Sequence, residues 1–233
     1  MSVQVYYKNK IFIILGIIAL TSIIVKLYSI NFGLPIHTDS FDIAMRSFAH
    51  LSGNFDVSPN RNFGLSLLQS PFLLLVNSNN FLDYSNIIRL FGIGVSTTSI
   101  FVMYLLARKF FSEKYSIIAA SLFAFSPQLN HSAGLGETEA LFILSLMCSL
   151  YFILRQTNDR LIFLSFVFAG IAYTIRPMGM IMIIILLIIY LINFRKNLKP
   201  SKFVFCIFLF ILIILPISLV RYDQYDDPLF YGD

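Results

Sequence analysis

Charged residues are scarce in this chain. Only 12% of its 233 residues are aspartate, glutamate, lysine or arginine, while hydrophobic residues make up 58% and the mean hydropathy is +0.80. In a soluble domain about a quarter of the residues are charged. The shortage excludes a soluble globular domain and predicts an all-α, polytopic membrane protein, in which each span needs about 20 apolar residues.

Three further absences narrow the class. The only two cysteines, Cys148 and Cys206, fall in separate apolar runs and predict packed small hydrophobes rather than a disulfide or a metal pair. The net charge of +5 comes mostly from short flanks of apolar runs, so we expect no nucleic-acid partner. No small-x-small cleavage site follows the first apolar run, which we expect to remain as an uncleaved anchor.

Seven apolar runs predict seven membrane spans, at residues 11–28, 90–107, 115–129, 140–154, 161–175, 178–194 and 203–220. Lys26 and Tyr28 close the first run, and we expect their side chains to reach the membrane interface. The apolar stretch 64–76 is too short to cross and contains Pro71, so it predicts an interfacial or re-entrant segment.

The distribution of charged residues along the chain favours seven spans. With a cytoplasmic amino terminus and seven spans, 10 of the 12 acidic residues lie outside and 11 of the 17 basic residues lie inside, namely Lys8, Lys10, Arg108, Lys109, Lys114, Arg155, Arg160, Arg195, Lys196, Lys199 and Lys202. A crossing by residues 64–76 would move the basic cluster 195–202 outside, against the positive-inside rule. The sequence therefore predicts a multi-pass plasma-membrane protein with its carboxy terminus outside.

The long first outer loop, residues 31–89, carries most of the polar residues. Within it, residues 40–52 predict an amphipathic juxtamembrane helix, because apolar residues recur at helical spacing at Phe41, Ala44, Met45, Phe48 and Leu51. Asp39, Asp42 and Arg46 would share the opposite face. Asp39 is either a helix cap or a functional carboxylate. Asp42 either pairs with Arg46 or takes part in catalysis.

The same loop holds two histidines. His37 and His50 could assist a metal together with Asp39, although a lone histidine near a membrane surface is more often structural. The sequence alone does not decide whether a metal ion binds here.

Three other charged residues fall at the outer ends of spans. Glu139 opens the fourth span, where it either stabilises the helix dipole or acts as a functional carboxylate at membrane depth. Arg176 precedes Pro177 at a predicted break between the fifth and sixth spans, and Arg89 lies at the outer start of the second. Each arginine either snorkels or binds a phosphate through its planar guanidinium.

Six motifs carry a resemblance to a known family. In chain order they are His37-Thr-Asp-Ser-Phe-Asp-Ile-Ala-Met-Arg46, Arg89-Leu-Phe-Gly, Tyr104-Leu-Leu-Ala-Arg-Lys-Phe-Phe111, Ala119-Ala-Ser-Leu-Phe-Ala-Phe-Ser-Pro127, Glu137-Thr-Glu-Ala-Leu141 and Ala169-Gly-Ile-Ala-Tyr-Thr-Ile-Arg-Pro177. With this order and topology the chain resembles, over nearly its whole length, the membrane glycosyltransferases of the GT-C fold, particularly the protein O-mannosyltransferases and lipid A aminoarabinose transferases.

The resemblance implies an inverting transfer of a sugar from a polyprenyl-phosphate donor to an acceptor hydroxyl, lipid or glycan on the non-cytoplasmic face. It implies that Asp39 is the base, with Asp42 as second choice and Glu139 as a further acidic site residue. Arg89 and Arg176 match basic positions near the donor phosphate. Many relatives have Asp-Glu where this chain has Asp39-Ser40, so a divalent cation is left open as a cofactor.

Similar enzymes continue beyond the point where this chain stops. We therefore expect residues 1–233 to form a single GT-C-like transmembrane module that lacks a carboxy-terminal part, and a second membrane subunit is a candidate partner beside the lipid bilayer and the donor. The alternatives are a transporter or substrate-binding subunit, or a non-catalytic fragment of a split enzyme. The chain shows no internal repeat and its acids gather at one membrane face, which favours interfacial chemistry over transport.

Overall fold

The computed structural model describes residues 2–36, 39–55, 63–155, 159–194 and 200–226. In these ranges all regular secondary structure is helical, as the sequence predicts. The elements are α1 (Ser2–Ser29), α2 (Asp39–Leu51), α3 (Gly64–Leu73), α4 (Phe81–Ala107), α5 (Glu113–Ala124), α6 (Pro127–Leu135), α7 (Glu139–Arg155), α8 (Asp159–Ile175), the 3₁₀ turn η1 (Pro177–Gly179), α9 (Met180–Phe194) and α10 (Pro200–Tyr225).

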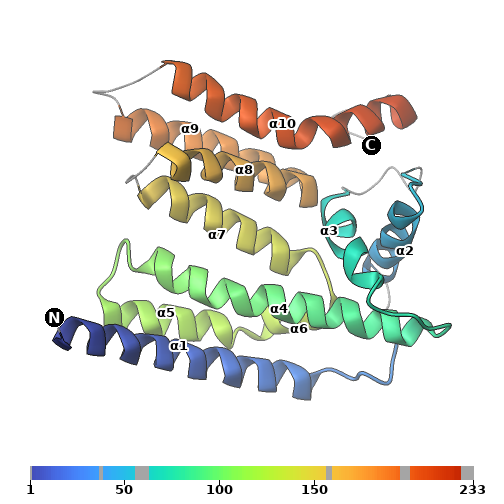
Figure 1. Ribbon diagram of the computed structural model, residues 1–233, viewed down its shortest axis with the longest axis horizontal. Coiled ribbons are helices and arrows are strands. Elements are labelled where there is room, and N and C mark those ends of the chain that lie inside the picture. Colours follow the sequence, from blue (N-terminus) through green and yellow to red (C-terminus); the bar gives the residue numbers. More distant parts are fainter. Residues whose placement is uncertain (1, 37–38, 56–62, 156–158, 195–199, 227–233) are drawn as a thin grey trace.

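The long helices lie alongside one another in a bundle made of α1, α4, α5, α7, α8, α9 and α10 (Figure 1). The short helices α2 and α3 lie at one end of it, on the right of Figure 1, where α1 and α10 end and α4 begins. We call this the α2 end of the bundle. The amino-terminal end of α1 lies at the opposite end.

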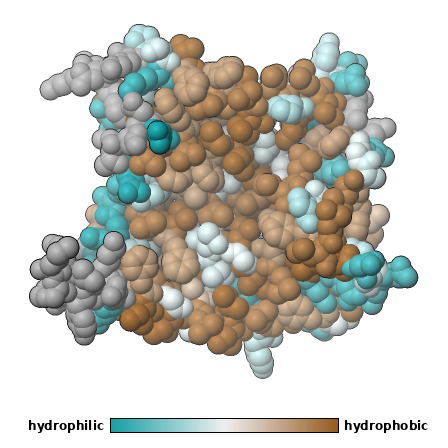
Figure 2. All heavy atoms as spheres, in the orientation of Figure 1, coloured by the Kyte–Doolittle hydropathy of each residue, from teal (hydrophilic) through white to brown (hydrophobic). Residues whose placement is uncertain are grey.

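The outer surface of the bundle is apolar. Figure 2 shows hydrophobic residues across the middle of the visible face, with hydrophilic residues gathered toward its left and right edges. Many large apolar side chains of α1, α9 and α10 are exposed, among them Ile17, Ile184 and Leu212. An apolar belt between two polar edges is the surface expected of a protein embedded in a bilayer.

Three helical stretches are long and apolar enough to cross a membrane, namely Lys10–Ser29, Phe81–Ala107 and Pro200–Asp223. Helices α6 and α7, bent by 117° at a short break, would give a fourth if counted as one span, and Arg160–Ile175 and Pro177–Asn193 are shorter apolar helices. The all-helical membrane fold is therefore confirmed among the described residues, while the count of seven spans stays a prediction.

Two predicted span boundaries are wrong. The expected helix 115–129 stops at Ala124, and α6 begins at Pro127 after an extended Ser126, because proline disfavours helical geometry in the residue before it. Helix α4 begins at Phe81, nine residues before the expected start, where the Asn80 side chain accepts a hydrogen bond from the Leu82 amide at 3.0 Å. Arg89 consequently lies inside α4 and not at its start.

Contrary to the prediction, the Lys26 side chain does not reach the membrane interface. Its side chain is fully buried, and its Nζ donates to Ser22 Oγ at 3.0 Å, whereas Tyr28 is exposed. Ser22 Oγ in turn donates to the Ala124 carbonyl at 2.9 Å, at the end of α5. Ser22 therefore links α1 to the end of α5, and Lys26 donates to the serine that makes this link.

The amphipathic helix in the first outer loop is confirmed, but its orientation differs from the prediction. Ile43, Arg46 and His50 of α2 are buried, whereas Phe41 and Met45 are exposed. Arg46 and His50 thus face the protein, whereas Asp39 and Asp42 of the predicted polar face are exposed or partly exposed, and part of the apolar stripe faces outward.

A glycine sets the separation of α4 and α6. A Cβ added at Gly92 would lie 2.3 Å from the Ala133 carbonyl oxygen, closer than any side chain could approach. The absence of a side chain therefore lets α6 pack directly on α4.

Candidate functional site

An ion pair joins two of the predicted site residues across 37 positions of sequence. Arg176 follows α8 in an extended conformation (φ −144°, ψ 136°), and Glu139 is the first residue of α7. The Arg176 Nη2 donates to Glu139 Oε1, and its Nε donates to Thr138 Oγ1 at 2.6 Å. The guanidinium carbon also lies 5.8 Å from the ring centre of Phe142. Three contacts, with Thr138, Glu139 and Phe142, thus fix the Arg176 side chain.

The second carboxylate oxygen of Glu139 has no such partner. Glu139 Oε2 is buried and accepts no hydrogen bond from any described residue, although the side chain as a whole is partly exposed. A buried carboxylate oxygen without a donor is costly, since it has lost its water. This oxygen can accept a hydrogen bond from the hydroxyl or amine of a substrate.

The two acids of the first outer loop that are predicted site residues, Asp39 and Asp42, lie at the start of α2. Asp39 is its first residue and is exposed. Asp42 Oδ2 accepts a hydrogen bond from Arg46 Nη2 at 2.8 Å, one turn further along the helix. Only 1% of the Arg46 side chain is exposed, against 40% of Asp42. The structural role considered for Asp42, pairing with Arg46, is therefore present.

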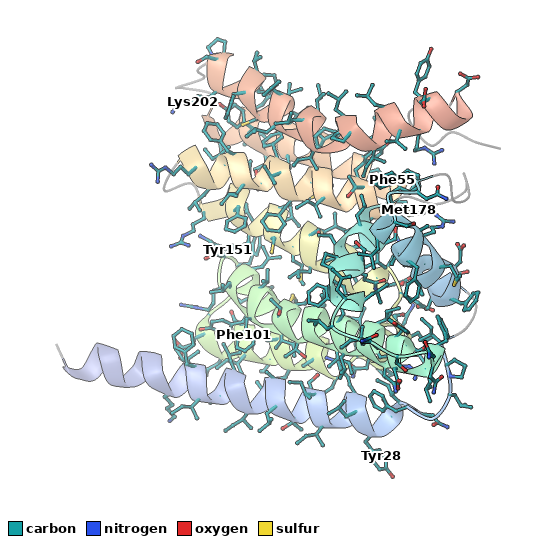
Figure 3. All side chains as sticks on the ribbon, turned by 45° about the vertical axis from the view of Figure 1, so that its right-hand side comes forward. Tyr28, Phe55, Phe101, Tyr151, Met178 and Lys202 are labelled. Carbon is teal, nitrogen blue, oxygen red and sulfur yellow. The ribbon has the colours of Figure 1, made fainter. Side chains whose placement is uncertain are left out.

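Packing brings α2 next to the ion pair. Ile43, adjacent to Asp42, belongs to one hydrophobic cluster with Leu65 and with Ile175, the residue before Arg176, and Phe142 packs against the same cluster. Figure 3 places Met178, which follows Arg176 by two positions, and Phe55, which follows α2, at the same end of the bundle. The α2 end therefore gathers the predicted acids of the loop with Glu139 and Arg176.

Arg89 lies in a different place. It is buried within α4, its Nη1 donates to Asn86 Oδ1 at 3.1 Å, and its guanidinium carbon lies 5.9 Å from the ring centre of Phe32. It lines a cavity of about 710 Å³ between the end of α1, α4 and α6. Asp39, Glu139 and Arg176 are not among the described residues that line this cavity. The two arginines predicted near one phosphate thus belong to two separate surroundings.

The metal considered for His37, His50 and Asp39 gains no support. His37 lies outside the described residues, and among those that are described no three histidine, cysteine or acidic side chains could hold a metal ion together. His50 is buried between the rings of Phe55 and Phe63, 5.0 and 5.4 Å from their centres. Burial, and then the nearby Arg46 charge, lower the pKa of His50 to about 4, so the imidazole is neutral.

Some residues of these sites carry no signal in the sequence alone. Phe142 lies one helical turn after Glu139, but nothing distinguishes it from the other aromatic residues of an apolar helix. Thr138 lies within the motif Glu137-Thr-Glu-Ala-Leu141. Its hydroxyl accepts a hydrogen bond from Arg176 only because the tertiary fold brings the two residues together. Cys148 and Cys206 are both buried and are not joined by a disulfide.

Comparison with known proteins identifies a family. Residues 68–219, more than half of the chain, match the family of dolichyl-phosphate-mannose-protein mannosyltransferases. No curated protein matches the chain.

The fold matches a solved structure. The crystal structure of the oligosaccharyltransferase of Archaeoglobus fulgidus in its apo form superposes on 97% of this chain with a TM-score of 0.73 and 16% sequence identity. That enzyme has a GT-C fold, so the expected fold class is confirmed. The match covers 31% of the archaeal protein, so the present chain spans about a third of its length.

Proposed function

Because the chain belongs to the family of dolichyl-phosphate-mannose-protein mannosyltransferases, we propose that it is a glycosyltransferase that takes a sugar from a polyprenyl-phosphate donor. The acceptor is a hydroxyl, lipid or glycan on the non-cytoplasmic face of the plasma membrane, with the amino terminus of the protein in the cytoplasm and the carboxy terminus outside. The observation that carries the proposal is the gathering of Asp39, Asp42, Glu139 and Arg176 at the α2 end of an apolar bundle.

Asp39 is the proposed base. Asp42 already shares its Oδ2 with Arg46, so it is the second choice. As the acceptor oxygen attacks the anomeric carbon, Asp39 takes its proton and the bond from that carbon to the phosphate oxygen breaks. General base catalysis of this kind typically contributes roughly 10²- to 10⁴-fold. A single displacement with one base inverts the anomeric centre.

Glu139 and Arg176 take supporting roles. The orphaned Oε2 of Glu139 accepts a hydrogen bond from the incoming sugar or acceptor, and Arg176 holds the carboxylate in place. The leaving polyprenyl phosphate gains negative charge, which Arg176 or Arg89 stabilises as a cation in a site with little water. A divalent cation remains outside the proposed mechanism.

The experiment that tests the function is an assay of the purified chain in vesicles with a panel of polyprenyl-phosphate sugars. Transfer to a hydroxyl acceptor, with inversion at the anomeric carbon, is the expected result. Uptake of the free sugar is measured in parallel, and uptake without transfer would favour the transporter instead. The assay is repeated with membrane extract, because a second membrane subunit completing the enzyme is part of the proposal.

A matched pair of variants separates catalysis from helix stabilisation. Asp39 and Asp83 are both acids in the first turn of a helix at the α2 end, in α2 and α4 respectively. Asp39→Asn is expected to abolish transfer while the protein stays folded, and Asp83→Asn to retain it. Equal activity in the two variants would remove Asp39 from the mechanism and leave it as a residue that stabilises the helix terminus.

A further inference from the structure

A groove on the surface of α4 lies outside the site described above. Its volume is about 400 Å³. One residue of α3, one of α7 and six of α4 line it, namely Phe72, Leu144, Ile87, Leu90, Phe91, Gly94, Val95 and Thr98. Gly94 is exposed, and no atom lies within 4 Å of the position that a Cβ would take there. The absence of a side chain at Gly94 therefore keeps this part of the groove open.

The groove and the cavity lined by Arg89 lie on opposite faces of α4. Ile87, Phe91, Gly94 and Thr98 follow one another at intervals of four, three and four residues, which places them on one face of the helix. Arg89 is two residues from both Ile87 and Phe91, about 200° around the helix from each. The described linings of the groove and of the cavity share no residue. The groove is therefore separate from the surroundings of Arg89.

The groove faces the bilayer. Residues 87–98 lie in the middle of Phe81–Ala107, one of the stretches that are long and apolar enough to cross a membrane. Leu90 is 47% exposed and Phe72 is 42% exposed, so apolar side chains border the groove on the outside. The groove thus continues the apolar belt of the bundle. At this depth lipid chains, and not water, surround a protein.

The groove offers nothing to a polar ligand. Among the described residues that line it, only Thr98 has a polar side chain, and its Oγ1 already donates to the Gly94 carbonyl at 2.9 Å. Phe72 and Phe91 line the groove with rings whose centres are 4.9 Å apart. A sugar or a phosphate would lose its hydrogen bonds to water here and gain none. A hydrocarbon chain loses nothing by entering it.

The dimensions of the groove fit a single chain. Because α4 rises about 16 Å from Ile87 to Thr98, a volume of about 400 Å³ corresponds to a mean cross-section of about 25 Å². Such a cross-section is roughly 5 Å wide, close to the thickness of one hydrocarbon chain in van der Waals contact with its neighbours. A helix about 10 Å across would need roughly three times this volume over the same length.

An acidic residue lies beyond the end of the groove that is nearer the α2 end. Asp83 precedes Ile87 by four residues, so it lies on the same face of α4, one turn closer to the start of the helix. Its side chain is exposed, and its Oδ2 accepts a hydrogen bond from Ser78 Oγ at 2.5 Å. A carboxylate at this position repels a headgroup that carries a net negative charge.

We propose that the groove holds one acyl chain of a bilayer phospholipid whose headgroup has no net charge, as a structural lipid between α3, α4 and α7. The chain fills the space beside Gly94 and packs against the rings of Phe72 and Phe91. None of the predicted site residues lines the groove, so the inference goes beyond the proposed function and does not depend on it.

The test measures lipid binding to the purified full chain in detergent by native mass spectrometry. The probes are a phosphatidylcholine, a phosphatidylglycerol with the same acyl chains, and a polyprenyl monophosphate. We expect the phosphatidylcholine to bind at least about threefold more tightly than the phosphatidylglycerol, because the two differ only in headgroup and net charge. Equal or tighter binding of the phosphatidylglycerol would overturn the proposal. Displacement of phosphatidylcholine by equimolar polyprenyl monophosphate would also overturn it, since the groove would then belong to a sugar donor.

Two glycines on membrane-spanning helices locate the lipid. Gly94→Leu fills part of the groove, and we expect phosphatidylcholine to bind about tenfold more weakly, as the loss of contact with about two methylenes implies. Gly16→Leu is the matched control, because Gly16 of α1 is also exposed with no atom within 4 Å of a Cβ but does not line the groove. It should bind the lipid as wild type does.

Two outcomes with these variants would contradict the site. One is equal lipid binding by Gly94→Leu and Gly16→Leu. The other is a dimer of the wild-type chain that Gly94→Leu loses while its lipid binding stays unchanged, which would assign the groove to a second copy of the chain.

A labelling experiment on the wild-type chain keeps the proposal testable if Gly94→Leu does not fold. A phosphatidylcholine with a photoreactive group in its acyl chain should label residues 87–98 and Leu144 more strongly than the exposed residues 12–24 of α1. Labelling spread evenly over the apolar belt would show contact with bulk lipid only, and would overturn the site.

Discussion

Arg176 bonds to only one of the two carboxylate oxygens of Glu139, and the other oxygen is buried with no hydrogen-bond partner in the part of the chain that the structure describes. The pair forms between the residue that follows α8 and the residue that opens α7, so it ties two helices together at the site. The same contact that stabilises the fold therefore leaves one acceptor for a ligand.

Breaking this pair should reveal its contribution to stability. Both side chains are about one-third exposed, so we expect Glu139→Gln and Arg176→Gln each to lower the free energy of unfolding by about 1–2 kcal/mol. The double variant should cost less than the sum of the two. Denaturant unfolding in detergent measures all three, and strictly additive losses would mean that the pair contributes nothing of its own.

Substituting either partner of the Asp42–Arg46 ion pair should destabilise the protein, but by unequal amounts. Arg46 is 1% exposed and Asp42 is 40% exposed. Asp42→Asn takes a carboxylate away from a buried guanidinium, at a cost of about 2–4 kcal/mol, whereas Arg46→Met removes the buried charge and should cost about 1 kcal/mol or less. Thermal unfolding of the two variants measures these costs. A larger loss of stability in Arg46→Met than in Asp42→Asn would contradict the burial of this arginine.

His50 should make stability depend on pH. Its pKa is lowered to about 4 in the folded protein from an ordinary 6.5, so the unfolded chain binds more protons between these values. Stability is therefore full above pH 6.5 and falls as the pH drops toward 4, by up to about 3 kcal/mol from this residue.

The variant His50→Phe tests this dependence, because its ring keeps the contacts with Phe55 and Phe63 but cannot be protonated. The loss of stability from pH 7 to pH 4 should be smaller in His50→Phe than in wild type. His131→Gln, at an exposed histidine, serves as control and should follow the wild-type curve. Parallel curves for wild type and His50→Phe would show that His50 does not titrate in this window.

Two glycines on α4 provide a matched test of helix packing. A Cβ at Gly92 would meet the Ala133 carbonyl oxygen at 2.3 Å, while one at Gly94 would meet no atom within 4 Å. Gly92→Ala should therefore destabilise the protein by about 2–3 kcal/mol through overpacking. Gly94→Ala should be neutral or stabilising by up to about 1 kcal/mol, because alanine favours helix. Comparable unfolding midpoints for the two would contradict the close approach of α6 to α4.

Patterns along the chain were sufficient for the local features. Runs of apolar residues predict the helices, Pro177 predicts the break that leaves Arg176 extended, and the polar segment before Glu139 predicts the start of α7. Each of these signals acts over a few residues, which is the range that hydropathy and proline geometry report.

Long-range contacts decide the rest. Hydropathy does not detect the first turns of α4, because Asp83, Asn86 and Arg89 make the segment polar although it is helical. The inward orientation of Arg46 depends on which side of α2 meets the protein, and the periodicity of α2 fits either side. The separation of Arg89 from Arg176 likewise depends on how α6 packs against α4.

The bend of 117° between α6 and α7 has an energetic consequence for a lipid substrate. The 17 residues of α7 extend about 25 Å, less than the roughly 30 Å of a hydrocarbon core, so a crossing helix of this length starts below the level of the surrounding headgroups. Pulling a lipid up into water would cost about 0.8 kcal/mol for each methylene exposed. For the lipid donor proposed above, a phosphate that sinks to meet the protein would avoid this extraction work, and the donor would arrive by lateral diffusion within its own leaflet.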